Sequence, residues 1–294
     1  MNQPYQPSEP PGAKVLLMGG SGSGKTYSIA SLASAGISVR YLWLEDGFDS
    51  TMRYFADRKI PVPANMHWQR ILINPVPFKE LMNTADLMNT LTFSGFANWQ
   101  DPNRGHHRSF YNILGALASY KCERTGASLG SAEDWGPDCA LVIDSLSALS
   151  DMAFTQLIGN KPLRDQGMYG IAQQAILMLL NKLTSLRCHF VLTAHIEREA
   201  DEINQTSRIM VATIGKKLPP RVPTFFSDVI HAKRDGTKFS WNTNTADFDL
   251  KTRLLPIAGG LEPSFIPLIA EWKRLRDHGG AQPAAIPIAA VTPG

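Results

Sequence analysis

Residues 15–26 read Val-Leu-Leu-Met-Gly-Gly-Ser-Gly-Ser-Gly-Lys-Thr, an apolar run that passes directly into a glycine-rich loop. The run predicts a buried strand, and residues 26–35 predict a helix after the loop. Glycines let the backbone turn so that successive N–H groups point inward, where they can bind phosphate oxygens. The helix aims its positive N-terminal end at the same place. The stretch therefore predicts a phosphate-binding loop made by Gly19, Gly20, Ser21, Gly22, Ser23, Gly24, Lys25 and Thr26.

Three side chains extend this prediction from phosphate to a nucleotide with its metal. Lys25 is expected to reach the terminal phosphates, and the Thr26 hydroxyl to bind Mg²⁺. Asp144 ends the apolar run Leu141–Ile143. A carboxylate at the end of such a strand is expected to hold the same Mg²⁺ through water. Glycine-serine runs also occur in linkers, but here a strand precedes the loop and a helix follows it. We therefore predict ATP (or GTP) and Mg²⁺ as ligands.

Apolar runs alternate with helical patterns along the chain, which predicts an α/β fold with a mainly parallel central sheet. Asp235-Gly236 predicts a tight turn in a late β-hairpin. The interval 51–135 is longer than a crossover needs and is interpreted as a helical insertion, so that 13–277 form a single domain. The expected strands are 39–44, 141–143, 189–194, 229–232 and 238–241, with a long helix over 169–186; residues 1–12 and 278–294 are expected to be flexible tails.

The composition indicates a soluble globular protein, with 44% apolar and 19% charged residues. The net charge of +3 gives no global attraction to nucleic acid, so any such site must be a local patch. Cys122, Cys139 and Cys188 lack CxxC spacing and are expected to be buried, reduced thiols of a cytoplasmic protein. Residues 1–12 lack the features of a signal peptide, and no apolar run is long enough to cross a bilayer. We expect no membrane association.

The group that activates the attacking water is less obvious. In many ATPases a glutamate directly follows the Mg²⁺ aspartate, but Ser145 stands in that place here. Glu45 lies at the tip of the strand after the glycine-loop helix, where a carboxylate can face the terminal phosphate. Asp46 is its nearest rival, and a solvated turn glutamate is the plain alternative. We predict that Glu45 is the base.

This set of motifs resembles the RecA-like ATPase family over roughly residues 13–257: the loop at 19–26, Glu45 at a strand end, Leu-Val-Ile-Asp-Ser at 141–145, and a strand ending in His195. The resemblance implies a RecA-like P-loop core. It also implies that Glu45 is the catalytic glutamate. His195 would be the polar residue that senses the γ-phosphate and passes its state to a DNA-contacting loop. A histidine at a strand end is otherwise usually a hydrogen-bonded core residue.

The resemblance extends to the end of the core, where residues 226–230 and a hairpin precede Lys251-Thr252-Arg253. In hexameric relatives a Lys-x-Arg pair on a strand reaches the neighbouring subunit's nucleotide. Alternate residues of a strand point the same way, so Lys251 and Arg253 can converge on one phosphate. The resemblance thus implies a homo-oligomer, a ring or a filament, in which these cations complete a partner's site. A solvated basic strand face is the alternative.

Small size and the Val-Leu-Thr-Ala-His-Ile-Glu run at 191–197 most resemble phage-encoded nucleotide-binding proteins, including single-strand-annealing-associated ATPases; the location would then be the host cytoplasm. Two stretches are candidates for single-stranded DNA. Residues 207–221 are basic and follow His195, and residues 99–110 place Arg104, His106, His107 and Arg108 between aromatics. Solvated loops are the plain reading of both. Zinc at His106, His107 and Cys122 is a weak alternative, because adjacent histidines rarely bind one metal.

The leading hypothesis is therefore an oligomeric, Mg²⁺-dependent RecA-like ATPase that acts on single-stranded DNA in recombination or replication. A nucleotide-gated assembly scaffold, in which occupancy alone sets an assembly state, is the first alternative. A P-loop kinase of a small molecule, with Arg104 and Arg108 in a lid, is the second. A kinase needs neither a strand-end glutamate placed for water nor a late Lys-x-Arg pair.

Overall fold

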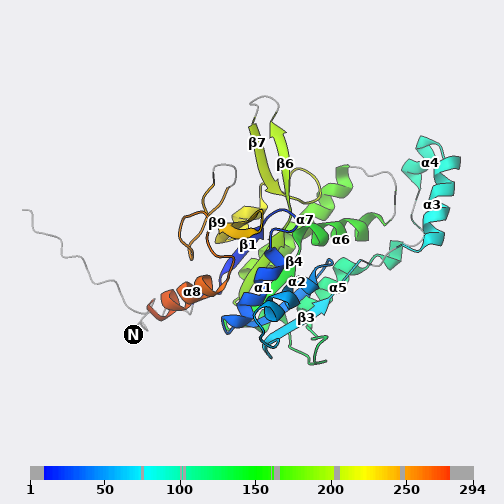
Figure 1. The fold of residues 1–294 in the computed structure, drawn as a ribbon. Helices are drawn as coiled ribbons and strands as arrows, with labels where there is room; N and C mark the ends of the chain where they lie inside the picture. The colour runs from blue at the N-terminus through cyan, green and yellow to red at the C-terminus, as the bar shows by residue number, and fades with distance from the viewer. Residues whose placement is uncertain are drawn as a thin grey trace, which may run out of the picture.

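A seven-stranded sheet forms the centre of the computed structural model, which describes residues 10–73, 76–99, 101, 104–159, 161, 166–201, 206–245 and 249–278 (Figure 1). The strand order is β3-β2-β4-β5-β1-β8-β9. Every neighbouring pair is parallel except the hairpin β8–β9. The predicted fold class is confirmed. The strands are β1 (Lys14–Met18), β2 (Ser38–Trp43), β3 (Met66–Arg70), β4 (Cys139–Asp144), β5 (His189–Ala194), β8 (Asp228–Asp235) and β9 (Lys238–Asn242).

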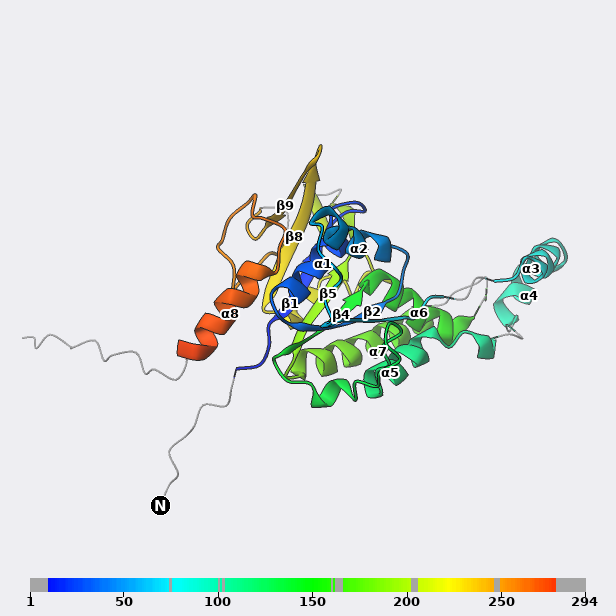
Figure 2. The same ribbon diagram turned by 60° about the horizontal axis from the view of Figure 1, so that its bottom comes forward.

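Helices cover both faces of this sheet (Figure 2). Along β1, Val15 and Leu17 join one apolar cluster, and Leu16 and Met18 join the other. A strand buried on both faces has no polar side, which is why β1, β4 and β5 appear in the sequence as continuous apolar runs. One layer holds α1 (Lys25–Ser34), α2 (Phe48–Asp57) and α8 (Ile266–His278); the other holds α5 (Ser109–Ala118), α6 (Leu146–Ile158) and α7 (Gln166–Ser185).

The parallel arrangement gathers four strand ends at one edge. In the register, Trp43 is aligned with Asp144, Ile143 with Leu192, and Met18 with Ala194. The carboxyl ends of β2, β4, β5 and β1 therefore lie next to one another. Ligands of open α/β sheets bind outside the carboxyl ends of the strands, so this edge is where a site is expected.

The interval 51–135, predicted as a helical insertion, also contains a strand of the central sheet. β3 pairs in parallel with β2, from Val39–Met66 to Trp43–Arg70. Its sequence, Met-His-Trp-Gln-Arg, shows no apolar run because it is an edge strand whose residues are mostly half-buried. The interval also holds α2, α3 (Phe78–Thr90), α4 (Phe93–Asn98), α5 and the short turns η1 (Arg104–His106) and η2 (Ala132–Asp134), joined by non-helical segments.

The segment after His195, where the resemblance implies a DNA-contacting loop, forms a hairpin. β6 (Ile196–Asp201) and β7 (Thr206–Val211) pair antiparallel as a separate two-stranded sheet, which Figure 1 shows projecting from the molecule. The sequence did not predict this hairpin, because charged residues interrupt the apolar alternation expected of a strand. Ile209 and Val211 are buried on β7, and a short turn, η3 (Val222–Phe225), leads on to β8.

Asp228 anchors the late part of the chain at the start of β8. Its buried Oδ1 accepts hydrogen bonds from the Thr252 hydroxyl (2.9 Å), the Arg253 N–H (2.8 Å) and the Leu254 N–H (3.1 Å). The Ser227 hydroxyl donates to Oδ2 (2.8 Å). The chain turns around this carboxylate, so the prediction of a strand carrying Lys251 and Arg253 is wrong. Lys251 forms a single bridge to Val229.

At the start of the described chain, residues assigned to a tail are partly held. The Gly12 N–H donates to the Arg187 carbonyl (2.8 Å), and the Trp272 indole N–H donates to the Pro11 carbonyl (3.0 Å). The rest of the two predicted tails, residues 1–9 and 279–294, lies outside the described residues. In the part of the chain that the structure describes, no helix is long and apolar enough to span a membrane.

We predict that Asp228→Ala lowers the free energy of unfolding by about 2–4 kcal/mol, because it leaves part-buried N–H groups without an acceptor and removes a fully buried, hydrogen-bonded side chain. Urea denaturation measures the change. Asp277→Ala, at an exposed carboxylate of α8, is the control and is expected to stay within about 0.5 kcal/mol of the wild type. A loss for Asp228→Ala as small as that of the control would contradict the anchoring role.

Candidate functional site

The glycine loop links β1 to α1 with the geometry of an anion site. Gly22 (φ 70°) and Gly24 (φ 86°) adopt the left-handed conformation that other residues rarely take. A β-carbon at Gly19 would lie 2.3 Å from the Ala232 carbonyl oxygen, so this position requires glycine. No side chain caps the N-terminus of α1. The first N–H groups of the helix are therefore left for a ligand.

Lys25 already spans this loop. Its buried ammonium donates to the carbonyl oxygens of Gly19 (2.9 Å) and Gly20 (3.0 Å). Burial lowers the pKa of Lys25, while the charges of Asp144 and Glu45 act in the opposite direction. Among the described residues, the buried Ser23 hydroxyl has no hydrogen-bond partner. An orphaned hydroxyl, an uncapped helix end and a cation held only by carbonyls together fit a phosphate chain.

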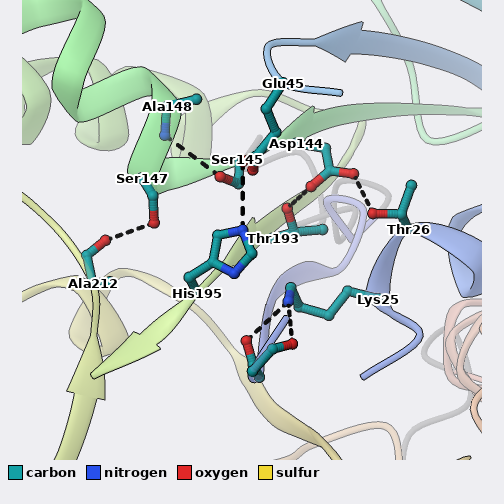
Figure 3. A network of polar contacts seen from close by, with 12 residues as sticks. Lys25, Thr26, Glu45, Asp144, Ser145, Ser147, Ala148, Thr193, His195 and Ala212 are labelled. Carbon is teal, nitrogen blue, oxygen red and sulfur yellow. Dashed lines mark hydrogen bonds and ion pairs between the residues drawn. The ribbon is translucent and has the colours of Figure 1, made fainter. Parts of the chain in front are cut away.

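The two residues predicted to hold the metal are in direct contact (Figure 3). The Thr26 hydroxyl donates to Asp144 Oδ2 at 2.9 Å, and the Thr193 hydroxyl donates to Oδ1. Asp144 is buried, at 4% exposure. A carboxylate beside a hydroxyl at the mouth of a phosphate loop supplies the hard oxygen ligands that Mg²⁺ prefers. The residues present therefore fit the cation.

Glu45 and His195 face each other at the same edge. His195 Nε2 lies 3.4 Å from Glu45 Oε2, and each side chain is about one-third exposed, at 34% and 33%. Burial would raise the pKa of Glu45. Hydrogen bonds from His195 and Ser145, with the charges of His195 and Lys25, outweigh it and hold the pKa below its ordinary value. Asp46, the rival candidate, is exposed.

His195 also lies where three elements meet. Its carbonyl accepts a hydrogen bond from the Ala212 N–H (2.8 Å), just after β7, and β6 begins at the next residue. The Ser147 hydroxyl of α6 donates to the Ala212 carbonyl (2.8 Å). Ser145, which stands where a glutamate often follows the aspartate, is the N-cap of α6. The projecting hairpin is thus rooted beside the Glu45–His195 pair.

The structure brings Lys25, Thr26, Glu45, Asp144 and His195 together, but not Lys251 and Arg253. Lys251 adjoins Val229, which is aligned with Leu16 in the middle of β1. Both basic side chains are exposed. Partial desolvation, together with repulsion by the neighbouring Arg253, lowers the pKa of Lys251. Within the described residues neither forms an ion pair or a side-chain hydrogen bond with the glycine loop.

The two stretches predicted to bind DNA are only partly suited to it. Lys217 and Arg221 are exposed in the described part of 207–221. In 99–110, Phe110 is buried at 9% exposure and packs in the core, so this one aromatic of the stretch is not available to stack on bases. His107 instead contacts Asp101 at 3.2 Å. Among the described residues no three His, Cys, Asp or Glu side chains form a metal cluster.

Two hydroxyl residues around Asp144 were missed from the sequence. Thr193 and Tyr41 both donate to its carboxylate, the latter at 2.7 Å to Oδ2. Each lies inside an apolar strand, β5 or β2. The only signal in the sequence was a single hydroxyl residue within each apolar run. That signal does not predict which neighbouring strand the hydroxyl will contact.

Comparison with known proteins gives the family. The family described as "AAA domain" matches residues 11–254, and the chain therefore belongs to it. No curated protein sequence matches the chain. Solved structures also align with the chain. The RadB recombinase has 14% identity and a TM-score of 0.39, over 86% of each chain. The flagellar accessory protein FlaH from Methanocaldococcus jannaschii has 11% identity and a TM-score of 0.34, over 86% of this chain and 90% of that one. Scores this low carry no argument about function.

We predict that His195→Gln raises the pKa of Glu45, because the imidazole contributes both a hydrogen bond and charge to the carboxylate. A carboxylate whose pKa is depressed by folding adds stability above its unfolded pKa and loses it as pH falls through the folded pKa. NMR titration of the glutamate carboxyl carbons measures the shift, with Glu45→Gln identifying the signal. His278→Gln, at an exposed site on α8, is the control. An unchanged Glu45 titration would contradict the pairing.

Proposed function

We propose that this AAA-domain protein is an Mg²⁺-dependent ATPase that works as an oligomer on single-stranded DNA. The observation that supports it best is the convergence of Lys25, Thr26, Asp144 and Glu45 on one edge of the sheet. A phosphate-binding loop alone serves many purposes. A carboxylate held ionised beside the loop is what hydrolysis additionally needs.

Each residue has a distinct part in this chemistry. The N–H groups of the glycine loop and α1 bind the β- and γ-phosphates, and Lys25 exchanges its loop carbonyls for phosphate oxygens. Thr26 and Asp144 hold Mg²⁺, which when bound neutralises charge on the phosphoryl oxygens. Glu45 orients the water and accepts its proton. His195 keeps Glu45 in place and ionised.

Oligomerisation is proposed from the positions of Lys251 and Arg253. They are exposed and are not in contact with the glycine loop of their own chain. We therefore propose that Lys251 and Arg253 contact the γ-phosphate bound by a neighbouring subunit. There their positive charges would stabilise the transition state in trans. Turnover would then depend on assembly into a ring or a filament.

Single-stranded DNA is proposed from the hairpin β6–β7. It projects from the molecule and begins at the residue after His195. A change in the Glu45–His195 contact on hydrolysis would act directly on its base, through the Ala212 hydrogen bonds. Exposed Lys217 and Arg221 follow the hairpin and would contact the phosphate backbone without reading sequence. Recombination or replication, in a phage-infected host's cytoplasm, is the setting we propose.

Phosphate release from Mg-ATP tests this function. We expect Lys25→Ala to abolish it, and Glu45→Gln to lower kcat by about 10²–10⁴-fold while nucleotide still binds. Glu262→Gln, at an exposed glutamate, is the matched control. Full turnover by Glu45→Gln would contradict a catalytic role for Glu45. Wild-type binding without any turnover would favour the nucleotide-gated scaffold. Phosphate transfer only with an added acceptor would favour a kinase.

The same assay tests assembly and DNA. We expect specific activity to rise with protein concentration and with single-stranded DNA, and salt to weaken the DNA effect. Mixing Lys25→Ala chains with Arg253→Ala chains is expected to restore activity, because one supplies an intact cation and the other an intact loop. Activity that ignores concentration, DNA and mixing would remove the oligomer and the nucleic acid together.

A further inference from the structure

Tyr41 on β2 holds the carboxylate expected to bind the metal. The side chain is fully buried, and its hydroxyl donates to Asp144 Oδ2 at 2.7 Å. The same oxygen accepts the Thr26 hydroxyl at 2.9 Å. The phenol is thus a second hydrogen-bond donor to this oxygen. If the Thr26 hydroxyl turns to bind a cation, the Tyr41 hydroxyl can still orient Asp144 Oδ2.

Thr51 on α2 connects this arrangement to the other metal-binding residue. Thr51 is fully buried, and its hydroxyl donates to the Thr26 carbonyl at 3.0 Å. It also lies near the Tyr41 hydroxyl: burial raises the pKa of that phenol, and the nearby Thr51 hydroxyl acts in the opposite direction. Contacts therefore run from Asp144 to Tyr41, to Thr51, to Thr26 and back to Asp144. A buried hydroxyl needs only one partner to be satisfied. Here the Tyr41 hydroxyl contacts Asp144 and the Thr51 hydroxyl contacts Thr26, the two residues that fit Mg²⁺.

We propose that Tyr41 and Thr51 are positioning residues for Mg²⁺, which fix the Asp144 carboxylate and the Thr26 backbone at the spacing that the cation requires. This inference rests on the proposed Mg-nucleotide site. Partners one step outside the ligands set their orientation, and losing one typically weakens metal binding by about 10–100-fold.

Tyr41→Phe and Thr51→Val each remove one hydroxyl with little change of shape, and calorimetry of ATP binding across a Mg²⁺ titration tests them. We expect the half-saturating Mg²⁺ concentration to rise about 10-fold or more, with ATP affinity in EDTA unchanged. Thr51→Ser should restore the wild-type value. Tyr27→Phe, which removes an exposed hydroxyl beside Asp57 (3.3 Å), is the control.

An unchanged Mg²⁺ requirement in both variants would overturn the proposal. So would an equal loss of affinity in EDTA, because that would show a general effect on the glycine loop. Failure of the wild type to bind nucleotide at all would instead overturn the proposed function. Thermal unfolding of each variant separates a folding defect from either result.

A second inference rests on the arm formed by α3 and α4, which both views draw away from the sheet (Figures 1 and 2). Residues 78, 81, 82, 85 and 88 lie on one face of α3 by their spacing. Its large side chains are exposed: Phe78 by 86%, Leu81 by 49%, Met82 by 67% and Met88 by 59%. Other residues of α3 face α4 around a small cavity, lined by Thr84, Leu87, Leu91, Phe96 and Trp99. The exposed stripe is therefore additional to the face that joins the two helices.

A groove of about 670 Å³ lies at the base of this arm, between the end of β3 and α5. Its lining is mixed: Ile71, Leu72, Tyr111 and Gly115 lie among polar and charged residues that include Arg70, Arg108 and Glu123. Leu72 lines the groove only a few residues before α3 begins. The arm and the groove of one chain are thus adjacent, and a two-fold axis would let two chains exchange them.

We infer that the arm's apolar stripe docks in the groove of a second copy of this chain. The stripe offers on the order of 500 Å², since one aromatic side chain alone buries about 150–250 Å². A monomer rarely exposes more than a few hundred Å² of contiguous apolar surface. Two symmetric arm–groove contacts give on the order of 1,000 Å² per partner, against about 800 Å² in a standard interface. An unrelated partner would make this contact only once.

Light scattering over a range of concentrations, without nucleotide, tests this interface. We expect the wild type to form a dimer, and Met82→Glu and Gly115→Glu each to weaken it at least about 10-fold. A β-carbon at Gly115 meets nothing within 4 Å, so that change does not strain the monomer. Asn83→Glu, on the polar side of α3, is the control. A wild-type monomer at all concentrations, or a dimer insensitive to both variants, would overturn the inference.

Discussion

The buried carboxylate of Asp144 is the constraint around which the site is built. A buried charge must be paired or hydrogen-bonded, because leaving it unsatisfied costs several kcal/mol. Three hydroxyls supply that satisfaction: Thr26 from α1, Tyr41 from β2 and Thr193 from β5. They can reach one carboxylate only if β4 lies between β2 and β5, with the glycine loop close by. The strand order therefore determines which side chains can reach the Asp144 carboxylate.

The remaining groups depend on that edge. Lys25 is held by the loop carbonyls, while Glu45 and His195 end the strands on either side of β4. Because His195 is bonded through Ala212 to the base of the β6–β7 hairpin, the polar network does not stop at the nucleotide. The same edge therefore joins the proposed phosphate site, the proposed water-activating pair and the projecting β6–β7 hairpin.

The sequence predicted those parts that are local. The glycine loop, the run ending at Asp144 and the strand ending at His195 are contiguous signals, and burial on both sheet faces makes them continuous apolar runs. β3 was missed because an edge strand of half-buried residues has no such run, and β6–β7 because charged residues interrupt its sequence. The parts of Tyr41 and Thr51 depend on strand register and on the approach of α2 to α1. Neither the register nor this helix contact can be predicted from a short stretch of sequence.

Calorimetric titration of the wild-type chain with ATP, with and without Mg²⁺ and beside Asp144→Asn, tests the central claim most directly. The account predicts one nucleotide per chain, an affinity that rises with Mg²⁺, and loss of that rise in Asp144→Asn, because the amide cannot supply the carboxylate's charge. Absence of nucleotide binding, or a Mg²⁺ effect that survives in Asp144→Asn, would contradict it.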